Sequence, residues 1–153
     1  PGEYRPHTYP ENCACYTGTH DNAPLLGWRE DAAPEDVARA TAYLGLNERE
    51  GFHWGMIRGG MSSVALLFVA QMQDYLGLGA ESRMNTPSTL GCNWQWRMQQ
   101  GDCTPALAEK MRFYTELYGF KARSVGKIER SRAMHCSRQR PPPKSPMRSV
   151  ERP

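Results

Sequence analysis

Residues 64–70 read VALLFVA, an unbroken apolar run of strand length. Such a run is typical of a parallel strand that is covered on both faces, because helices pack on each side of a parallel sheet. A shorter apolar run at 12–17 (NCACYT) predicts a buried strand earlier in the chain. These two runs predict a fold of the α/β class, built around parallel strands.

Three helices are expected around these strands. The first spans 34–44, with proline in its first turn and glycine just after its last residue. The second spans about 47–62, and the third runs from Pro105 to about Tyr118 with Thr104 as its N-cap. The apolar stripes that we expect to be buried are Val37, Ala40, Thr41 and Leu44; Trp54, Ile57 and Met61; and Leu107, Met111, Tyr114 and Leu117 or Tyr118.

The order strand, helix, helix, strand, long loop, helix predicts two βα units. Two such units cannot close a sheet or bury both faces of these strands, and the first residue is Pro1 rather than Met. We therefore expect the chain to be a piece of a longer protein that does not fold alone. The long segment 71–98 is expected to be functional and ordered. Four tryptophans are expected in the core: Trp28, Trp54, Trp94 and Trp96.

Charge divides the chain into two parts. Residues 1–120 carry nine Lys and Arg against fourteen Asp and Glu, a net charge of −5, whereas residues 121–153 carry ten against two, a net charge of +8. We expect a folded domain at 1–120 and a disordered tail at 121–153, because the tail is basic, rich in proline and almost without aliphatic residues. An acidic body is not typical of a nucleic-acid binder.

Further features bound the cellular setting. No apolar run approaches the roughly 18 residues of a membrane span, and no secretory signal is recognised. The cysteines are odd in number, and the pair at 13 and 15 has no second pair to complete a zinc site. They are interpreted as small apolar residues in a reducing compartment.

Polar residues with functional chemistry follow the first strand, in the stretch YTGTHDN at 16–22. A histidine and an aspartate stand side by side after a glycine that allows a sharp turn. A purely structural pair is one alternative. A metal site is another, but it would need further ligands, and the spacing of His7, His53 and His135 supplies none.

Three stretches resemble one known family. They are HTYPENCACYTGTHDN at 7–22, GLNEREGFHWGMIRGGMSSVA at 45–65, and AQMQDYLGLGAESRMNTPSTLGCNWQWRM at 70–98. Together they are similar to the C-terminal part of the 4-alpha-glucanotransferases, also called amylomaltases or disproportionating enzymes. The resemblance implies the C-terminal part of a (β/α)8 TIM barrel of the alpha-amylase superfamily type, carrying its last two βα units.

The family resemblance also implies a reaction and the residues that serve it. Members transfer α-1,4-glucan segments between maltooligosaccharides, starch or glycogen by a retaining double displacement that needs three carboxylates. Asp21 is expected to be the carboxylate that grips the sugar, with His20 beside it as the second catalytic residue. Asn22 and Asn85 are expected to bind substrate, although Asn85 is also open to the interpretation that it caps its own loop.

The resemblance implies no cofactor and no metal. The nucleophile and the general acid/base lie upstream in the family, so this chain alone is expected to be inactive. The expected partner is a maltooligosaccharide or a starch-like or glycogen-like glucan, not a nucleic acid or a membrane. The expected location is the cytoplasm, or the plastid stroma if a transit peptide precedes the chain. Two alternatives remain: an inactive glucan-binding remnant, and an interaction protein that acts through its basic tail.

Overall fold

The structure is a computed structural model that describes residues 5–120. All of these residues belong to one compact unit. The predicted disordered tail at 121–153 lies outside the described residues, so the expected division of the chain at residue 120 stays a prediction.

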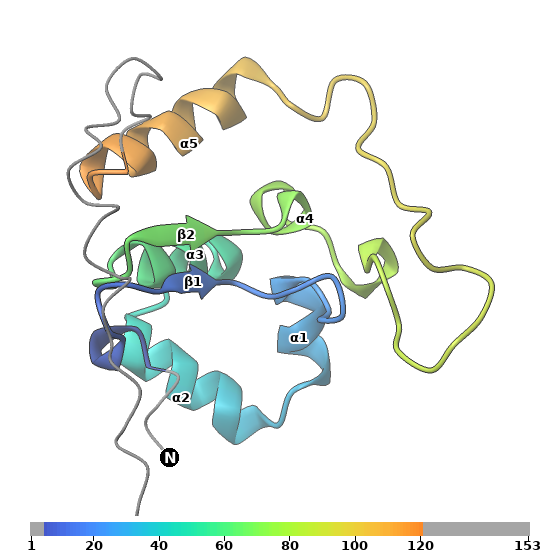
Figure 1. Ribbon diagram of the computed structural model, residues 1–153, viewed down its shortest axis with the longest axis horizontal. Helices are drawn as coiled ribbons and strands as arrows, with labels where there is room; N and C mark the ends of the chain where they lie inside the picture. Colours follow the sequence, from blue (N-terminus) through green and yellow to red (C-terminus); the bar gives the residue numbers. More distant parts are fainter. Residues whose placement is uncertain (1–4, 121–153) are drawn as a thin grey trace, which may run out of the picture. The chain divides into compact units, whose positions relative to one another are not determined.

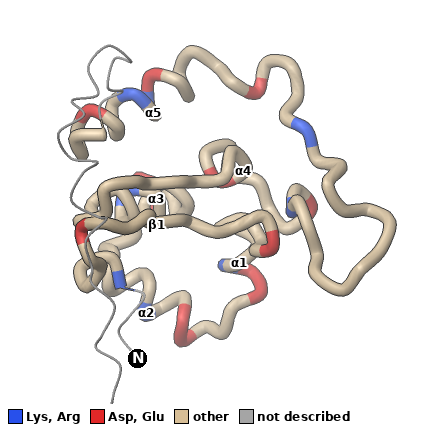
Figure 2. The backbone as a smooth tube through the Cα atoms, viewed as in Figure 1, with Lys and Arg blue, Asp and Glu red and all other residues tan. Residues whose placement is uncertain are grey.

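Two strands form the centre of the described chain. β1 (Ala14–Tyr16) and β2 (Leu67–Val69) pair in parallel, with Cys15 opposite Phe68 in the register. Figure 1 shows both arrows pointing toward the same end. The parallel pairing predicted from the two apolar runs is confirmed, although each strand is shorter than its run. Neither strand carries a charged residue, and the charges lie on helices and loops (Figure 2).

Within the described residues one face of the parallel pair is left uncovered, as expected of two βα units that cannot bury both faces of their strands. Side chains alternate between the faces of a strand. Phe68 turns toward the helices, where its ring lies against Gly60. On the opposite face Tyr16, Leu67 and Val69 are 53%, 54% and 37% exposed, because no element of residues 5–120 packs over them. We call these three residues the open sheet face.

Within residues 5–120, five α-helices and two short 3₁₀ turns surround the strands. Their bounds are η1 Pro6–Thr8, α1 Leu25–Asp31, α2 Pro34–Leu44, α3 Phe52–Met61, α4 Met72–Leu76, η2 Ala80–Ser82 and α5 Pro105–Leu117.

The core of the described chain is built on α3. Its residues Trp54, Ile57 and Met61 are buried together with Leu25 of α1, as the apolar stripe of this helix predicts. The helix contacts α1, α2, α4, α5 and β1. Partly buried side chains complete the cluster: Met56, Phe68, Tyr75, Leu107, Met111, Tyr114, Tyr118 and Phe120. On α5 it is therefore Tyr118 that packs inward, while Leu117 is exposed.

The predicted ends of the outer helices agree with the structure. α2 spans 34–44 as predicted, and Gly45 follows it in the left-handed conformation with a φ of 62°. Its predicted apolar stripe is half-buried. α5 begins after Thr104, whose hydroxyl accepts a hydrogen bond from the backbone N–H of Leu107 at 3.1 Å. Capping and turn chemistry therefore set both helices locally.

The predicted start of the middle helix is wrong by five residues. α3 begins at Phe52 rather than near Asn47. The side-chain oxygen of Asn47 accepts from the backbone N–H of Glu50 at 3.0 Å, and Gly51 has a φ of 89°. This local turn competes with helix formation, as asparagine side chains often do.

Candidate active site

The site predicted from the histidine–aspartate pair lies where the two parallel strands end. β1 continues into residues 17–24, and β2 continues into α4 and then into the segment that contains Asn85 (Figure 1). In parallel α/β folds the carboxyl ends of the strands are where ligands bind. The predicted site residues therefore belong to loops at the appropriate end of the sheet.

A buried carboxylate fixes both ends of the loop that follows β1. Asp74, on α4, is 1% exposed. It accepts a hydrogen bond from the Thr17 hydroxyl at 2.5 Å and another from the backbone N–H of Leu25 at 2.7 Å. Burial raises the pKa of Asp74, and these two bonds oppose the shift. Asp74 therefore holds the loop in place from beneath rather than facing a ligand.

A tight turn then presents the pair. The side-chain oxygen of Asn22 accepts from the backbone N–H of Thr19 at 2.8 Å and from its hydroxyl at 2.9 Å. The backbone N–H of Asn22 donates to the carbonyl of Thr19 at 3.0 Å. Asn22 thus closes the turn that carries His20 and Asp21, and its direct contact with substrate stays a prediction.

One carboxylate oxygen of Asp21 is hydrogen-bonded within the described chain and the other is not. Oδ1 accepts from Nδ2 of Asn85 at 2.6 Å and lies 3.3 Å from Nε2 of His20. Within residues 5–120, Oδ2 has no hydrogen-bond partner. The side chains of His20 and Asp21 are 53% and 47% exposed. Asp21 is therefore oriented by its neighbours and still open to an external donor.

Asn85 is tied to the turn by its backbone as well. Its N–H donates to the carbonyl of His20 at 3.0 Å. The guanidinium of Arg83 donates to the carbonyl of Asp21 through Nη2 and to the carbonyl of Asn85 through Nε at 2.9 Å. The sequence prediction did not include Arg83. Asn85 therefore does more than cap its own loop, because it is bonded to His20 and Asp21. Its contact with glucan stays a prediction.

The expected core position of Trp94 is wrong. The residue is 53% exposed, and its indole contacts the imidazole of His20, with ring centroids 4.9 Å apart. Its φ of 65° turns the chain so that the alternation expected of an extended segment does not apply. Trp54 is buried as predicted, and Trp28 and Trp96 are half-buried. Trp94 thus joins the site, and its place in the same long segment as Asn85 is the sequence signal that could have indicated this.

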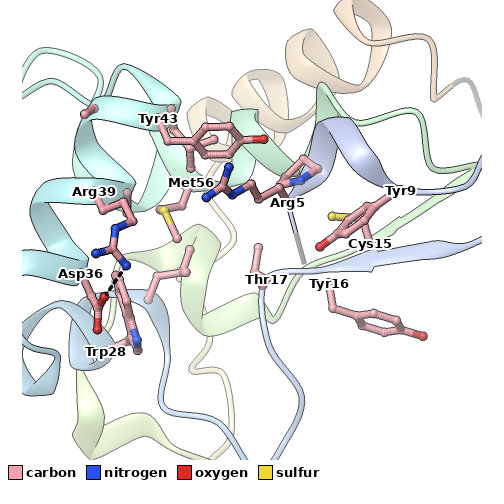
Figure 3. Close-up of a pocket in the computed structure, with 16 residues that line it drawn as sticks. Arg5, Tyr9, Cys15, Tyr16, Thr17, Trp28, Asp36, Arg39, Tyr43 and Met56 are labelled. Atoms are coloured by element: carbon pink, nitrogen blue, oxygen red, sulfur yellow. Dashed lines mark hydrogen bonds and ion pairs between the residues drawn. The ribbon is translucent and has the colours of Figure 1, made fainter. Parts of the chain in front are cut away.

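A separate hollow of about 740 Å³ lies beside β1. It is lined largely by apolar side chains from β1, α1 and α2, and the ion pair of Asp36 with Arg39 lies at its edge (Figure 3). Neither His20 nor Asp21 lines it. In a closed βα barrel such a place beside a strand receives the next unit of the barrel.

Residues 5–120 contain neither a metal site nor a membrane-spanning helix. No group of three or more His, Cys, Asp or Glu side chains is placed to hold a metal ion. No helix in this part of the chain has the length and apolar character to cross a membrane.

Comparison with solved structures defines the class of fold. The chain is similar to an amylomaltase from Streptococcus agalactiae solved in complex with acarbose, with a TM-score of 0.72 and 38% identity over 74% of this chain and 23% of the other. The two βα units therefore represent part of a TIM barrel of the alpha-amylase superfamily type. Residues 1–104 match the 4-alpha-glucanotransferase family, and the chain belongs to this family.

Curated relatives carry the same description. The 4-alpha-glucanotransferase of Clostridium butyricum is 48% identical over 117 residues, which are 76% of this chain and 24% of the relative. The chloroplastic/amyloplastic 4-alpha-glucanotransferase of Solanum tuberosum is 41% identical over 74% of this chain and 20% of its own length. The chain thus spans about a quarter or less of these relatives, and the family resemblance read from the three motifs is confirmed.

Proposed function

We propose that this chain supplies the sugar-gripping part of the active site of a 4-alpha-glucanotransferase. The reaction is the transfer of α-1,4-glucan segments between maltooligosaccharides, starch or glycogen by a retaining double displacement. Family membership and the similarity to an amylomaltase solved with acarbose support this proposal. The site belongs in the cytoplasm or the plastid stroma, where such glucans occur.

One observation carries the proposal more than any other. Asp21 stands at the carboxyl end of a parallel strand, with Oδ1 held by Asn85 and 3.3 Å from Nε2 of His20, and with Oδ2 open. A carboxylate held in this way is preorganised to accept a hydrogen bond from a sugar hydroxyl. Nε2 of His20 is turned to Asp21, so Nδ1 is left for a neighbouring hydroxyl. Oδ2 of Asp21 and Nδ1 of His20 could thus bond to two adjacent hydroxyls of one sugar ring.

The chemistry explains why such a grip accelerates the reaction. Glycoside cleavage passes through an oxocarbenium-like transition state in a distorted ring. A hydrogen bond that strengthens in the distorted ring lowers the barrier, whereas one that is equal in both states only tightens binding. An ionised Asp21 strengthens its bonds to the ring hydroxyls as positive charge develops on the sugar.

The two bond-breaking carboxylates are proposed to lie outside residues 1–153. Asp74 is not one of them, because it is buried and bonded to Thr17 and Leu25. We therefore expect the 153-residue chain to be inactive alone and the complete gene product to be active. The coding sequence upstream of Pro1 tests this directly, since an open frame there should supply both missing carboxylates. If it does not, an inactive glucan-binding remnant is the better description.

The role of Asp21 is tested with maltotriose. The complete gene product should convert it into glucose and longer oligosaccharides, separated by chromatography. Asp21→Asn keeps the shape and the bond to Asn85 but removes the charge, and we expect at least ~100-fold slower transfer because a charge-assisted bond is lost in the transition state. Asp36→Asn, in an exposed ion pair on α2, is the matched control and should transfer at the wild-type rate. Near-normal transfer by Asp21→Asn would refute the assigned role.

A further inference from the structure

Trp94 holds a conformation that bulky residues rarely adopt. Its φ of 65° lies in the left-handed region, which costs a non-glycine residue about 1–2 kcal/mol and persists where the surroundings impose it. Its backbone N–H donates to the carbonyl of Met84 at 2.7 Å. Its ring lies on that of His20 with an angle of 41° between the planes. The backbone thus adopts an unfavourable geometry that brings the indole onto the imidazole.

The loop before Trp94 is closed by the residue next to it. Oδ1 of Asn93 accepts from the backbone N–H of Thr86 at 2.9 Å. Nδ2 of Asn93 donates to the carbonyl and to the hydroxyl of Thr89, both at 3.1 Å. Asn93 therefore gathers residues 86–93 into a closed loop, and Trp94 leaves that loop at a fixed point beside Met84.

His20 otherwise has little to hold its ring. Its carbonyl is bonded to the N–H of Asn85, which fixes the backbone, and Nε2 lies 3.3 Å from Asp21. The side chain is 53% exposed, and its χ angles are restrained by that one polar contact and by the tilted ring contact with Trp94. Removing the indole would leave the imidazole free to rotate away from Asp21.

We propose that Trp94 is a positioning residue that acts through His20. Its ring holds the imidazole in the one orientation that keeps Nε2 on Asp21 and Nδ1 toward the substrate. This inference rests on the proposed function of the His20–Asp21 pair. The strained backbone at 94, the closed loop at 86–93 and the bonds of Asn85 to the same turn are parts of one support for His20.

A double-mutant cycle in the complete gene product tests the proposal. Trp94→Leu should lower kcat for maltotriose transfer about 10-fold and leave KM within about twofold, because an aromatic contact is worth about a factor of ten. In a His20→Ala background the same substitution should cost nothing more, since Trp94 acts through the missing ring. Trp94→Phe should restore most of the rate. Phe113→Leu, which removes an exposed ring from α5, should change neither constant.

Two results for Trp94→Leu would overturn the inference. A wild-type kcat for Trp94→Leu would do so, and so would additive losses in the double variant, which would place Trp94 against the sugar itself. If Trp94→Leu does not fold, as judged by its melting curve, Asn93→Ala loosens the same loop and serves in its place. Asn93→Ala should then lower kcat when His20 is present and have no further effect in the His20→Ala background. Any other result for this variant would contradict the inference. Asp21→Asn separates the two proposals: if that variant is inactive while Trp94→Leu is normal, only the role of Trp94 fails.

Discussion

Gly27 marks the tightest backbone approach in α1. A Cβ placed there would lie 2.8 Å from the backbone N and 2.9 Å from the Cα of Ala80 in η2. Backbone atoms cannot move aside as a side-chain end can. Gly27→Ala should therefore lower the free energy of unfolding of the complete gene product by about 1–3 kcal/mol, despite the better helix propensity of alanine. Urea denaturation measures this change.

Gly59 in α3 is the matched control for that substitution. A Cβ there would meet the side chain of Leu44, with Cδ2 at 2.7 Å. Leu44 is half-buried and can turn its methyl groups away, so the gain in helix propensity offsets the crowding. Gly59→Ala should change the free energy of unfolding by less than about 1 kcal/mol. Equal losses at the two positions would contradict the distinction between backbone and side-chain contact.

At the scale of the elements, a network around one carboxylate links three helices. Glu50 accepts from Nε of Arg58 in α3 at 2.9 Å and from the hydroxyl of Tyr114 in α5 at 2.8 Å. Nη2 of Arg58 donates in turn to the carbonyl of Leu44 at the end of α2 at 2.8 Å. Burial and the bond to Glu50 raise the pKa of Tyr114 to about 12, so its hydroxyl remains a donor throughout the neutral range.

Removing Glu50 should therefore loosen the packing of α5 on α3. Glu50→Ala leaves Arg58 and Tyr114 without their shared acceptor, and we expect a loss of about 2 kcal/mol in the free energy of unfolding. Asp36→Ala breaks the exposed ion pair with Arg39 on α2 and should cost less than about 0.5 kcal/mol. Both are measured by urea denaturation of the complete gene product. A small effect of Glu50→Ala would show that the apolar contacts of Tyr114 suffice.

Which elements could be predicted follows from how local their signals are. The bounds of α2 and the start of α5 are set by Pro34, Gly45 and Thr104, all of which act within one turn of the helix end. α1 and α4 were not predicted. α1 is seven residues long, and its first N–H is satisfied by Asp74, which is 49 residues away in sequence. A contact between residues so far apart in the sequence leaves no signal in the residues around α1.

The same reasoning applies to the candidate site. His20 and Asp21 were recognisable because a short motif carries them. Arg83 and Trp94 join them through bonds and ring contacts that span more than sixty residues, which no local periodicity reveals. The sequence places Trp94 in the core because aromatic side chains are usually buried. Its left-handed backbone instead directs the indole toward His20.

At the scale of the whole chain, the open sheet face determines whether the isolated chain associates with itself. Tyr16, Leu67 and Val69 lie side by side on the surface of residues 5–120, although all three are large apolar residues of the kind that usually fill a core. In a closed barrel this face is the interior, filled by side chains of the other strands. The hollow beside β1 is likewise lined by apolar groups that a further βα unit would cover.

The 153-residue chain produced alone should therefore self-associate and bind a hydrophobic dye, as followed by light scattering and fluorescence. Leu67→Glu should reduce this association, because it places a charge on the open sheet face. In the complete gene product the same change should cost about 3 kcal/mol or more, because the charge then lies unpaired in the barrel interior. Leu117 on α5 is also an exposed leucine, and Leu117→Glu should have little effect on association or on stability. A monomeric isolated chain that melts cooperatively would show that residues 1–153 bury their core unaided.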